Sequence, residues 1–240
     1  MAHLTTPAGR PMNVPFGEGR RRLPIYLLLD CSYSMEGAPL AAMLDALERF
    51  VAETKKNTLA RETVHVGVIP FQADEAHLIS DELVPIDDFA VPELKAAGNT
   101  PLGAAFRELT RSLDRDVTLT VKGKPPGDWK PLVYVLTDGR PTDDWAGPRQ
   151  EVEDRTQKKL VNVITVGFGP EVDDKTLAAI STGPTYHIED RSSDAFKHLF
   201  MWVTQTAVTV NEELGKNPAA DELTTTAPPA PAELRPVLNF

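Results

Sequence analysis

The sequence predicts a three-layer α/β/α domain whose central sheet is mostly parallel, with about six strands and one short antiparallel strand at an edge. Two observations carry this prediction. The run at residues 24–30 is apolar on both of its alternating faces, which is typical of a strand in a parallel sheet covered on both sides. Similar runs alternate along the chain with segments of helical periodicity, and this alternation favours parallel strands joined by helices.

Each element follows from a local pattern. Residues 38–57 place Leu40, Met43 and Leu47 at helical spacing, and Thr100-Pro101 has the hydroxyl and the proline of a helix start. The segment 76–80 is expected to pair antiparallel at the sheet edge. The expected strands cover residues 24–30, 63–71, 76–80, 130–138, 160–169 and 185–189. The expected helices cover residues 38–57, 100–113, 146–159, 173–180 and 192–208.

The length and composition predict one folded domain with two tails. The chain has 240 residues, of which 41% are hydrophobic and 25% charged, enough for one sizeable core. We expect an N-terminal arm at 1–21, the domain at 22–208 and a Pro/Ala/Thr-rich tail at 209–240. The basic triplet at 20–22 is expected to be a solvated part of the arm. For the last residues, LRPVLNF, an ordinary chain end is favoured over a docking peptide.

Charge and cysteine content narrow the classes of partner and compartment. The net charge of −10 argues against a general affinity for nucleic acid or anionic lipid. No apolar run approaches the roughly 20 residues that a membrane span needs, and the first 22 residues contain no signal-like apolar core. A single cysteine, Cys31, fits a reducing compartment, so we expect a cytoplasmic protein with no membrane or nucleic-acid partner. Its thiol is expected to be buried.

Residues with oxygen donors follow two of the expected strands and precede one of the expected helices. Asp30 closes the first strand and is followed by Ser32 and Ser34, Asp138 closes the strand at 130–138, and Thr100 precedes a helix. Ligands of parallel sheets bind outside the carboxyl ends of the strands, so these five groups are expected around one point. All are hard oxygen donors without His or Cys at zinc spacing, which favours Mg²⁺, with Mn²⁺ and Ca²⁺ as alternatives.

The same residues carry a family resemblance. Asp30-x-Ser32-x-Ser34, Thr100 and Asp138-Gly139 resemble the metal-ion-dependent adhesion site of von Willebrand factor type A domains, over about residues 22–208. The resemblance implies a Rossmann-like fold and a non-enzymatic module in which a bound ion captures an Asp or Glu of a partner protein. It also implies that Ser32, Ser34 and, in some states, Thr100 contact the ion directly, while the two aspartates act directly or through water.

A finer resemblance concerns residues 127–145. GDWKPLVYVLTDGRPTDDW looks like the TerY group of bacterial tellurite-resistance proteins, which implies a stress-response assembly with a protein kinase or a PP2C-type phosphatase as partner. Tyr33 and Asn99 stand where the family often has glycine. Tyr33 is a candidate partner contact beside the ion, and so is Trp145 if it is exposed. For Asp143 and Asp144, capping of the following helix is favoured.

Two other interpretations remain open from the sequence. A Mg²⁺-dependent phosphoryl-transfer hydrolase could use the two strand-end aspartates, but the chain has no GxxxxGK[ST] phosphate loop and Ser32 stands where a general acid would be expected. A metal-independent scaffold of the same fold is the other alternative. The complete set of five ligand types favours the metal-dependent module over both.

Overall fold

The computed structural model describes residues 21–121, 123–216 and 228–237, and its centre is a sheet of five parallel strands. In spatial order they are β2 (Val64–Gln72), β1 (Leu23–Asp30), β5 (Leu132–Thr137), β6 (Asn162–Phe168) and β7 (Thr185–Ile188). Three two-residue strands pair antiparallel at the sides: β3 (Glu75–Ala76) and β4 (Val84–Pro85) on β2, and β8 (Arg235–Pro236) on β7. The predicted fold class is confirmed, although the strand expected at 76–80 is shorter and β4 and β8 were not foreseen.

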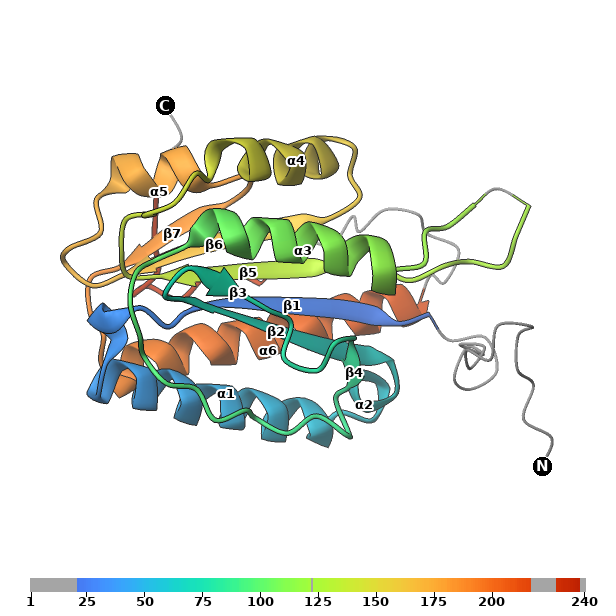
Figure 1. The fold of residues 1–240 in the computed structure, drawn as a ribbon. Helices are drawn as coiled ribbons and strands as arrows, with labels where there is room; N and C mark the ends of the chain where they lie inside the picture. Colours follow the sequence, from blue (N-terminus) through green and yellow to red (C-terminus); the bar gives the residue numbers. More distant parts are fainter. Residues whose placement is uncertain (1–20, 122, 217–227, 238–240) are drawn as a thin grey trace.

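Helices cover both faces of this sheet (Figure 1). On one face lie α1 (Ala38–Lys56), α2 (Thr58–Thr63) and α6 (Ser193–Lys216). On the other face lie α3 (Leu102–Asp116), α4 (Ala146–Gln157) and α5 (Asp174–Ile180). The helix expected to end at 208 continues to Lys216. None of the helices in the described ranges is long and apolar enough to cross a membrane.

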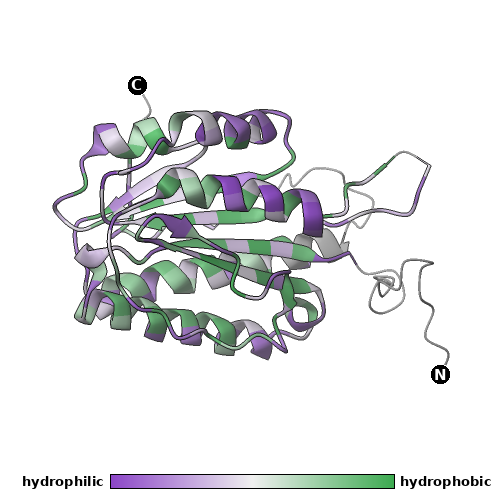
Figure 2. Cartoon of the chain, in the orientation of Figure 1, coloured by the Kyte–Doolittle hydropathy of each residue, from purple (hydrophilic) through white to green (hydrophobic). Residues whose placement is uncertain are grey.

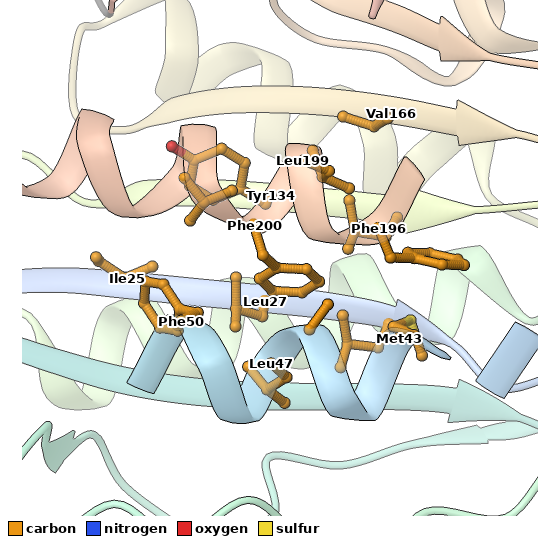
Figure 3. Close-up of a cluster of buried hydrophobic side chains, with 14 of the residues drawn as sticks. Ile25, Leu27, Met43, Leu47, Phe50, Tyr134, Val166, Phe196, Leu199 and Phe200 are labelled. Carbon is orange, nitrogen blue, oxygen red and sulfur yellow. The ribbon is translucent and has the colours of Figure 1, made fainter. Parts of the chain in front are cut away.

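Successive side chains of β1 point to opposite faces of the sheet and belong to two separate hydrophobic clusters. Ile25 and Leu27 face α1 and α6, while Tyr26 and Leu28 belong to the cluster under α3 and α4. Hydrophobic residues therefore fill the strands as well as α1 and α6, whereas α4 is largely hydrophilic (Figure 2). The first cluster joins aromatic rings of α1 and α6 above β1 and β5 (Figure 3), where the rings of Phe50 and Phe200 lie 6.2 Å apart.

The chain returns to the sheet after α6. Leu234 is buried in the first cluster and Val237 in the second. Arg235 donates two hydrogen bonds to the carboxylate of Asp174, at 2.7 and 3.0 Å, and Pro228 accepts one from the indole of Trp202 at 2.8 Å. The expectation of an ordinary chain end was therefore wrong for residues 234–237, while residues 238–240 lie outside the described residues. The apolar Leu-x-x-Val pattern was the signal, and the free edge of β7 supplied the place to bury it.

The basic triplet at 20–22 is also not simply solvated. The guanidinium of Arg21 lies 3.6 Å from the centre of the Trp129 ring, and Arg22 binds both carboxylate oxygens of Asp128 at 2.7 and 2.6 Å. Residue 20 lies outside the described residues. These contacts fasten the start of β1 to the long loop between α3 and β5, because a guanidinium pairs well with both an aromatic face and a carboxylate.

The buried ring between α1 and α6 gives a first prediction. Phe200 is 1% exposed, and its truncation to alanine leaves a cavity that costs about 3–5 kcal/mol of unfolding free energy. The measurement is equilibrium urea unfolding of Phe200→Ala. Its neighbour Met201 is 46% exposed, so Met201→Ala serves as control with a change within about 0.5 kcal/mol. Equal losses in the two variants would contradict the packing described for α6.

Candidate metal centre

The predicted donors lie at the carboxyl end of the sheet, where its strand order reverses. β1 and β5 are parallel neighbours, with Leu29 beside Leu136. The chain continues from β1 to β2 on one side and from β5 to β6 on the other, so the crevice between β1 and β5 is the usual ligand position of such sheets. Asp30 is the last residue of β1 and Asp138 follows β5 directly. Asp30 and Asp138 therefore stand at the ends of neighbouring parallel strands.

The two serines turn toward Asp138. A single 3₁₀ turn at Tyr33–Met35 brings the hydroxyls of Ser32 and Ser34 to 2.9 Å from each other. The Ser34 hydroxyl donates a hydrogen bond of 2.7 Å to Oδ1 of Asp138. Thr100 approaches from the third loop, since its Oγ1 would lie 3.1 Å from a Cβ placed on Gly139. The structure thus brings all five predicted donors to one end of the β1–β5 crevice.

Asp30 is a fully buried carboxylate held by short hydrogen bonds. Oδ1 accepts from the Ser32 amide at 3.0 Å and Oδ2 from the Thr137 hydroxyl at 2.6 Å. Burial is the largest influence on its acidity and raises the pKa of Asp30 to about 6, although these hydrogen bonds lower it. Between the ordinary pKa of 3.8 and this value the folded chain binds the extra proton, so this carboxyl stabilises the metal-free fold as the pH falls through that window.

Asp138 is 1% exposed and faces one cation of the chain itself. Burial raises the pKa of its carboxyl above the ordinary value, while the Ser34 hydrogen bond and the positive charge of Arg191 lower it. Nη1 of Arg191 lies 3.0 Å from Oδ2 of Asp138. The sequence analysis did not identify Arg191, which lies 53 positions further along the chain in an ordinary-looking loop between β7 and α6.

Thr100 is not the cap of α3, as its position before Pro101 suggested. The helix begins at Leu102 without a cap from its own flank. The carboxylate of Asp143 instead accepts hydrogen bonds from the amides of Gly103 and Ala104, both at 2.8 Å. The expectation that Asp143 and Asp144 cap α4 was therefore wrong, since α4 begins after Trp145 without a side-chain cap. Because Asp143 satisfies the helix start from another loop, the hydroxyl of Thr100 remains available to the crevice.

The two departures from the family pattern are accommodated without strain. Tyr33 does not adopt a positive φ, and its ring is 65% exposed beside the serines. The left-handed residue of the second loop is Gly98, with φ of 57°, so Asn99 need not adopt that conformation. Trp145 is half-buried and packs against the cluster under α3 and α4. Partner contact by Tyr33 or Trp145 stays a prediction.

The chemistry of these donors fits a hard divalent cation. Two carboxylates and three hydroxyls converge, and one carboxylate oxygen, Oδ2 of Asp138, is buried and accepts no well-aligned hydrogen bond within the described chain, although Nη1 of Arg191 lies 3.0 Å away. Mg²⁺ prefers such oxygen ligands and retains some water. Within the described ranges no three His, Cys, Asp or Glu side chains form a metal-binding group, so a site made only of those residue types is not found there.

The family follows from a sequence model. The model of the von Willebrand factor type A domain matches residues 25–201, which include every donor described above. The chain belongs to this family. No curated protein is similar enough in sequence to count as a relative.

Cys31, which separates Asp30 from Ser32 in this VWA domain, is fully buried, and burial raises the pKa of its thiol to about 12.

Solved structures with the same fold come from distant proteins. A von Willebrand factor type A protein from Catenulispora acidiphila superposes with a TM-score of 0.58 at 17% identity, covering 78% of this chain and 43% of that chain. The pilus adhesin SpaC from Lactobacillus rhamnosus GG gives 0.60 at 14% identity, covering 80% and 31%. Proximal thread matrix protein 1 from the mussel byssus, with a zinc-occupied MIDAS motif, gives 0.52 at 19% identity, covering 77% and 48%. The VWA domain described here spans less than half of each of these chains.

The cross-loop cap gives a second prediction. Asp143→Ala leaves two amides of α3 without acceptors and should lower the unfolding free energy by about 1–2 kcal/mol. Urea unfolding measures this loss. Asp144→Ala removes a neighbouring carboxylate that is exposed, and it should change the stability by less than about 0.5 kcal/mol. If Asp144→Ala were as costly as Asp143→Ala, the loss would reflect loop charge and not the cap.

Proposed function

We propose that this VWA domain is a metal-dependent protein-interaction module. It binds Mg²⁺ through Asp30, Ser32, Ser34, Thr100 and Asp138 and then captures an Asp or Glu side chain of a partner protein. The observation that carries the proposal is the hydroxyl chain beside the buried Asp30: Ser32 and Ser34 lie 2.9 Å apart, and Ser34 donates a hydrogen bond of 2.7 Å to Asp138. The bound ion would supply a positive charge with an open coordination position for the carboxylate of the partner.

Each group of the chain has a separate task in this proposal. Ser32 and Ser34 offer neutral oxygens, which leave much of the positive charge of an ion uncompensated for an incoming carboxylate. Asp30 fixes the serine loop through the Ser32 amide, and Thr137 fixes Asp30 in turn. Asp138 orients the Ser34 hydroxyl. We assign no catalytic step to these residues, because all of them are occupied in holding and orienting one another.

The partner surface is proposed to include the ring of Tyr33. It is 65% exposed and follows directly on a metal-site serine, so a partner that reaches the crevice would cover it. Exposed aromatic side chains are frequent anchors of interfaces. Trp145 is a weaker candidate, since its side chain is partly buried and packs against the core.

We further propose a TerY-like role in a bacterial cytoplasmic stress or tellurite-resistance assembly, with a kinase or a PP2C-type phosphatase as the acidic partner. The residues 127–145 that resemble this group support the assignment, and they include Asp138 together with the capping residue Asp143. Divalent metal binding has separate support, because the mussel proximal thread matrix protein 1, which has a similar fold, holds zinc in its MIDAS motif.

Metal binding gives the third prediction. Calorimetric titration with Mn²⁺ should show one site in the wild type and no measurable binding in Asp30→Asn. The affinity should fall about tenfold from pH 7 to pH 5, because the pKa of Asp30 is raised to about 6 and the metal must displace its proton below that pH.

A surface carboxylate provides the control for this titration. Asp114 is 63% exposed on α3, and Asp114→Asn should bind Mn²⁺ like the wild type. Unchanged affinity in Asp30→Asn would remove the proposed site, and a pH-independent affinity would show that Asp30 is not the titrating ligand.

Partner capture gives the fourth prediction. In pull-downs from lysate of the source cell, the wild-type chain in Mg²⁺ should retain a partner that is lost in EDTA and lost with Asp138→Ala in Mg²⁺. Mass spectrometry should identify a kinase or a phosphatase among the retained proteins if the TerY-like assignment holds. Equal recovery under all three conditions would separate partner binding from the metal site.

A further inference from the structure

Arg191 reaches the candidate metal centre from the loop after β7, two strands away from β5 in the sheet. It stands in the loop between β7 and α6, and its side chain is only 22% exposed. The guanidinium passes over Gly169 at the end of β6, where any Cβ would collide with Nε of Arg191. Gly169 has a φ of 91°, which only glycine adopts readily. The absence of a side chain at Gly169 therefore leaves room for the Arg191 side chain to extend to Asp138.

The guanidinium bridges two of the three loops that carry the donors. Nη1 lies 3.0 Å from Oδ2 of Asp138 and donates a hydrogen bond of 3.3 Å to the carbonyl of Ser34. Together with the Ser34 hydroxyl on Oδ1, this contact occupies both carboxylate oxygens of Asp138. A fixed positive charge therefore already lies against a carboxylate that the ion needs.

The contact with Asp138 is close but poorly aligned. Within the described chain, Oδ2 of Asp138 accepts no hydrogen bond that satisfies the usual angles, although Nη1 of Arg191 lies 3.0 Å away. Nε of Arg191 likewise makes no hydrogen bond there. An ion pair without aligned hydrogen bonds is held by charge attraction alone, which a divalent ion can exceed. Asp138 can therefore exchange one cation for the other without losing its bond to Ser34.

We propose that Arg191 is a built-in cation that competes with the divalent ion for Asp138 and thereby sets the metal affinity of the site. The inference rests on the proposed metal-dependent function. A guanidinium stays charged at every pH at which the chain is folded, so it cannot yield by losing a proton. A metal ion must instead displace the guanidinium from Oδ2 of Asp138 and remain close to its positive charge. Arg191 therefore lowers the affinity of the site for metal, and it compensates the negative charge of Asp138 when no metal is bound.

The competition predicts a gain of function on mutation. In calorimetric titration of the full chain with Mn²⁺ at pH 7.5, Arg191→Gln should bind at least about tenfold more tightly than the wild type, since one neighbouring charge typically shifts an ionic equilibrium of a carboxylate by tenfold or more. A purely structural role would give weaker binding instead. Arg191→Lys keeps the charge and should stay within about threefold of the wild type.

Charge loss elsewhere at the same end of the sheet is the matched control. Arg140 follows Asp138 by two residues, is 73% exposed and pairs with Asp173 at 2.7 Å. Arg140→Gln removes the same charge without touching Asp138 and should change the Mn²⁺ affinity by less than about threefold, as expected for a screened surface charge. A gain as large as that of Arg191→Gln would show a general charge effect and overturn the inference.

Thermal unfolding gives an independent readout. Without metal, Arg191→Gln should melt below the wild type, because Asp138 is left buried with no cation. The rise in melting temperature on adding Mn²⁺ should be larger in the variant than in the wild type, as tighter binding requires. Weaker or equal Mn²⁺ binding by a folded Arg191→Gln would refute the competition while leaving the metal site intact. Absence of binding in both proteins would refute the metal site itself.

Discussion

The candidate metal centre depends on one constraint: two carboxylates are buried at the ends of neighbouring parallel strands and must be compensated there. Asp30 and Asp138 are almost inaccessible, and burial raises the pKa of both. Each is therefore surrounded by hydrogen-bond donors or a positive charge. Thr137 and the Ser32 amide compensate Asp30, while Ser34 and Arg191 compensate Asp138. A crevice that must supply positive charge and hydroxyls to two acids is also suited to a hard cation.

The surrounding loops are fixed to one another more than to their own helices. Thr142 is bonded to Thr100 through both the amide and the carbonyl of that residue, at 3.1 and 3.0 Å. Asp143 caps α3 across the same gap. The loop after β5 thus serves as the support for the loop before α3, and the position of Thr100 depends on residues more than 40 positions away. Such cross-loop support gives a metal site its rigidity.

The VWA fold of this chain supplies the scaffold, and the loops at the carboxyl end of the sheet carry the features in which this chain is distinctive. Fold alone does not define function in a scaffold shared by adhesins, matrix proteins and many others. The features particular to this chain are the exposed Tyr33, the internal cation Arg191 and the returning segment that ends in Leu234, Arg235 and Val237. Two of these three lie at the metal face, so differences in recognition should arise there.

The sequence alone determined the order of the five parallel strands and of the five longer helices, the buried character of β1 and β5, and the types of the five donors, because these depend on local periodicity and on residue chemistry. The ends of helices and strands were predicted less well, since α6 continues to Lys216 and not to residue 208. The burial of the apolar Leu234 and Val237 beside β7 was not predicted either. Only the tertiary structure decided that Asp143 caps α3, that Arg21 and Arg22 are bound, and that Arg191 faces Asp138. Each of these is a pairing of charge or hydrogen-bonding groups between distant segments, and no local pattern encodes the distance between such groups.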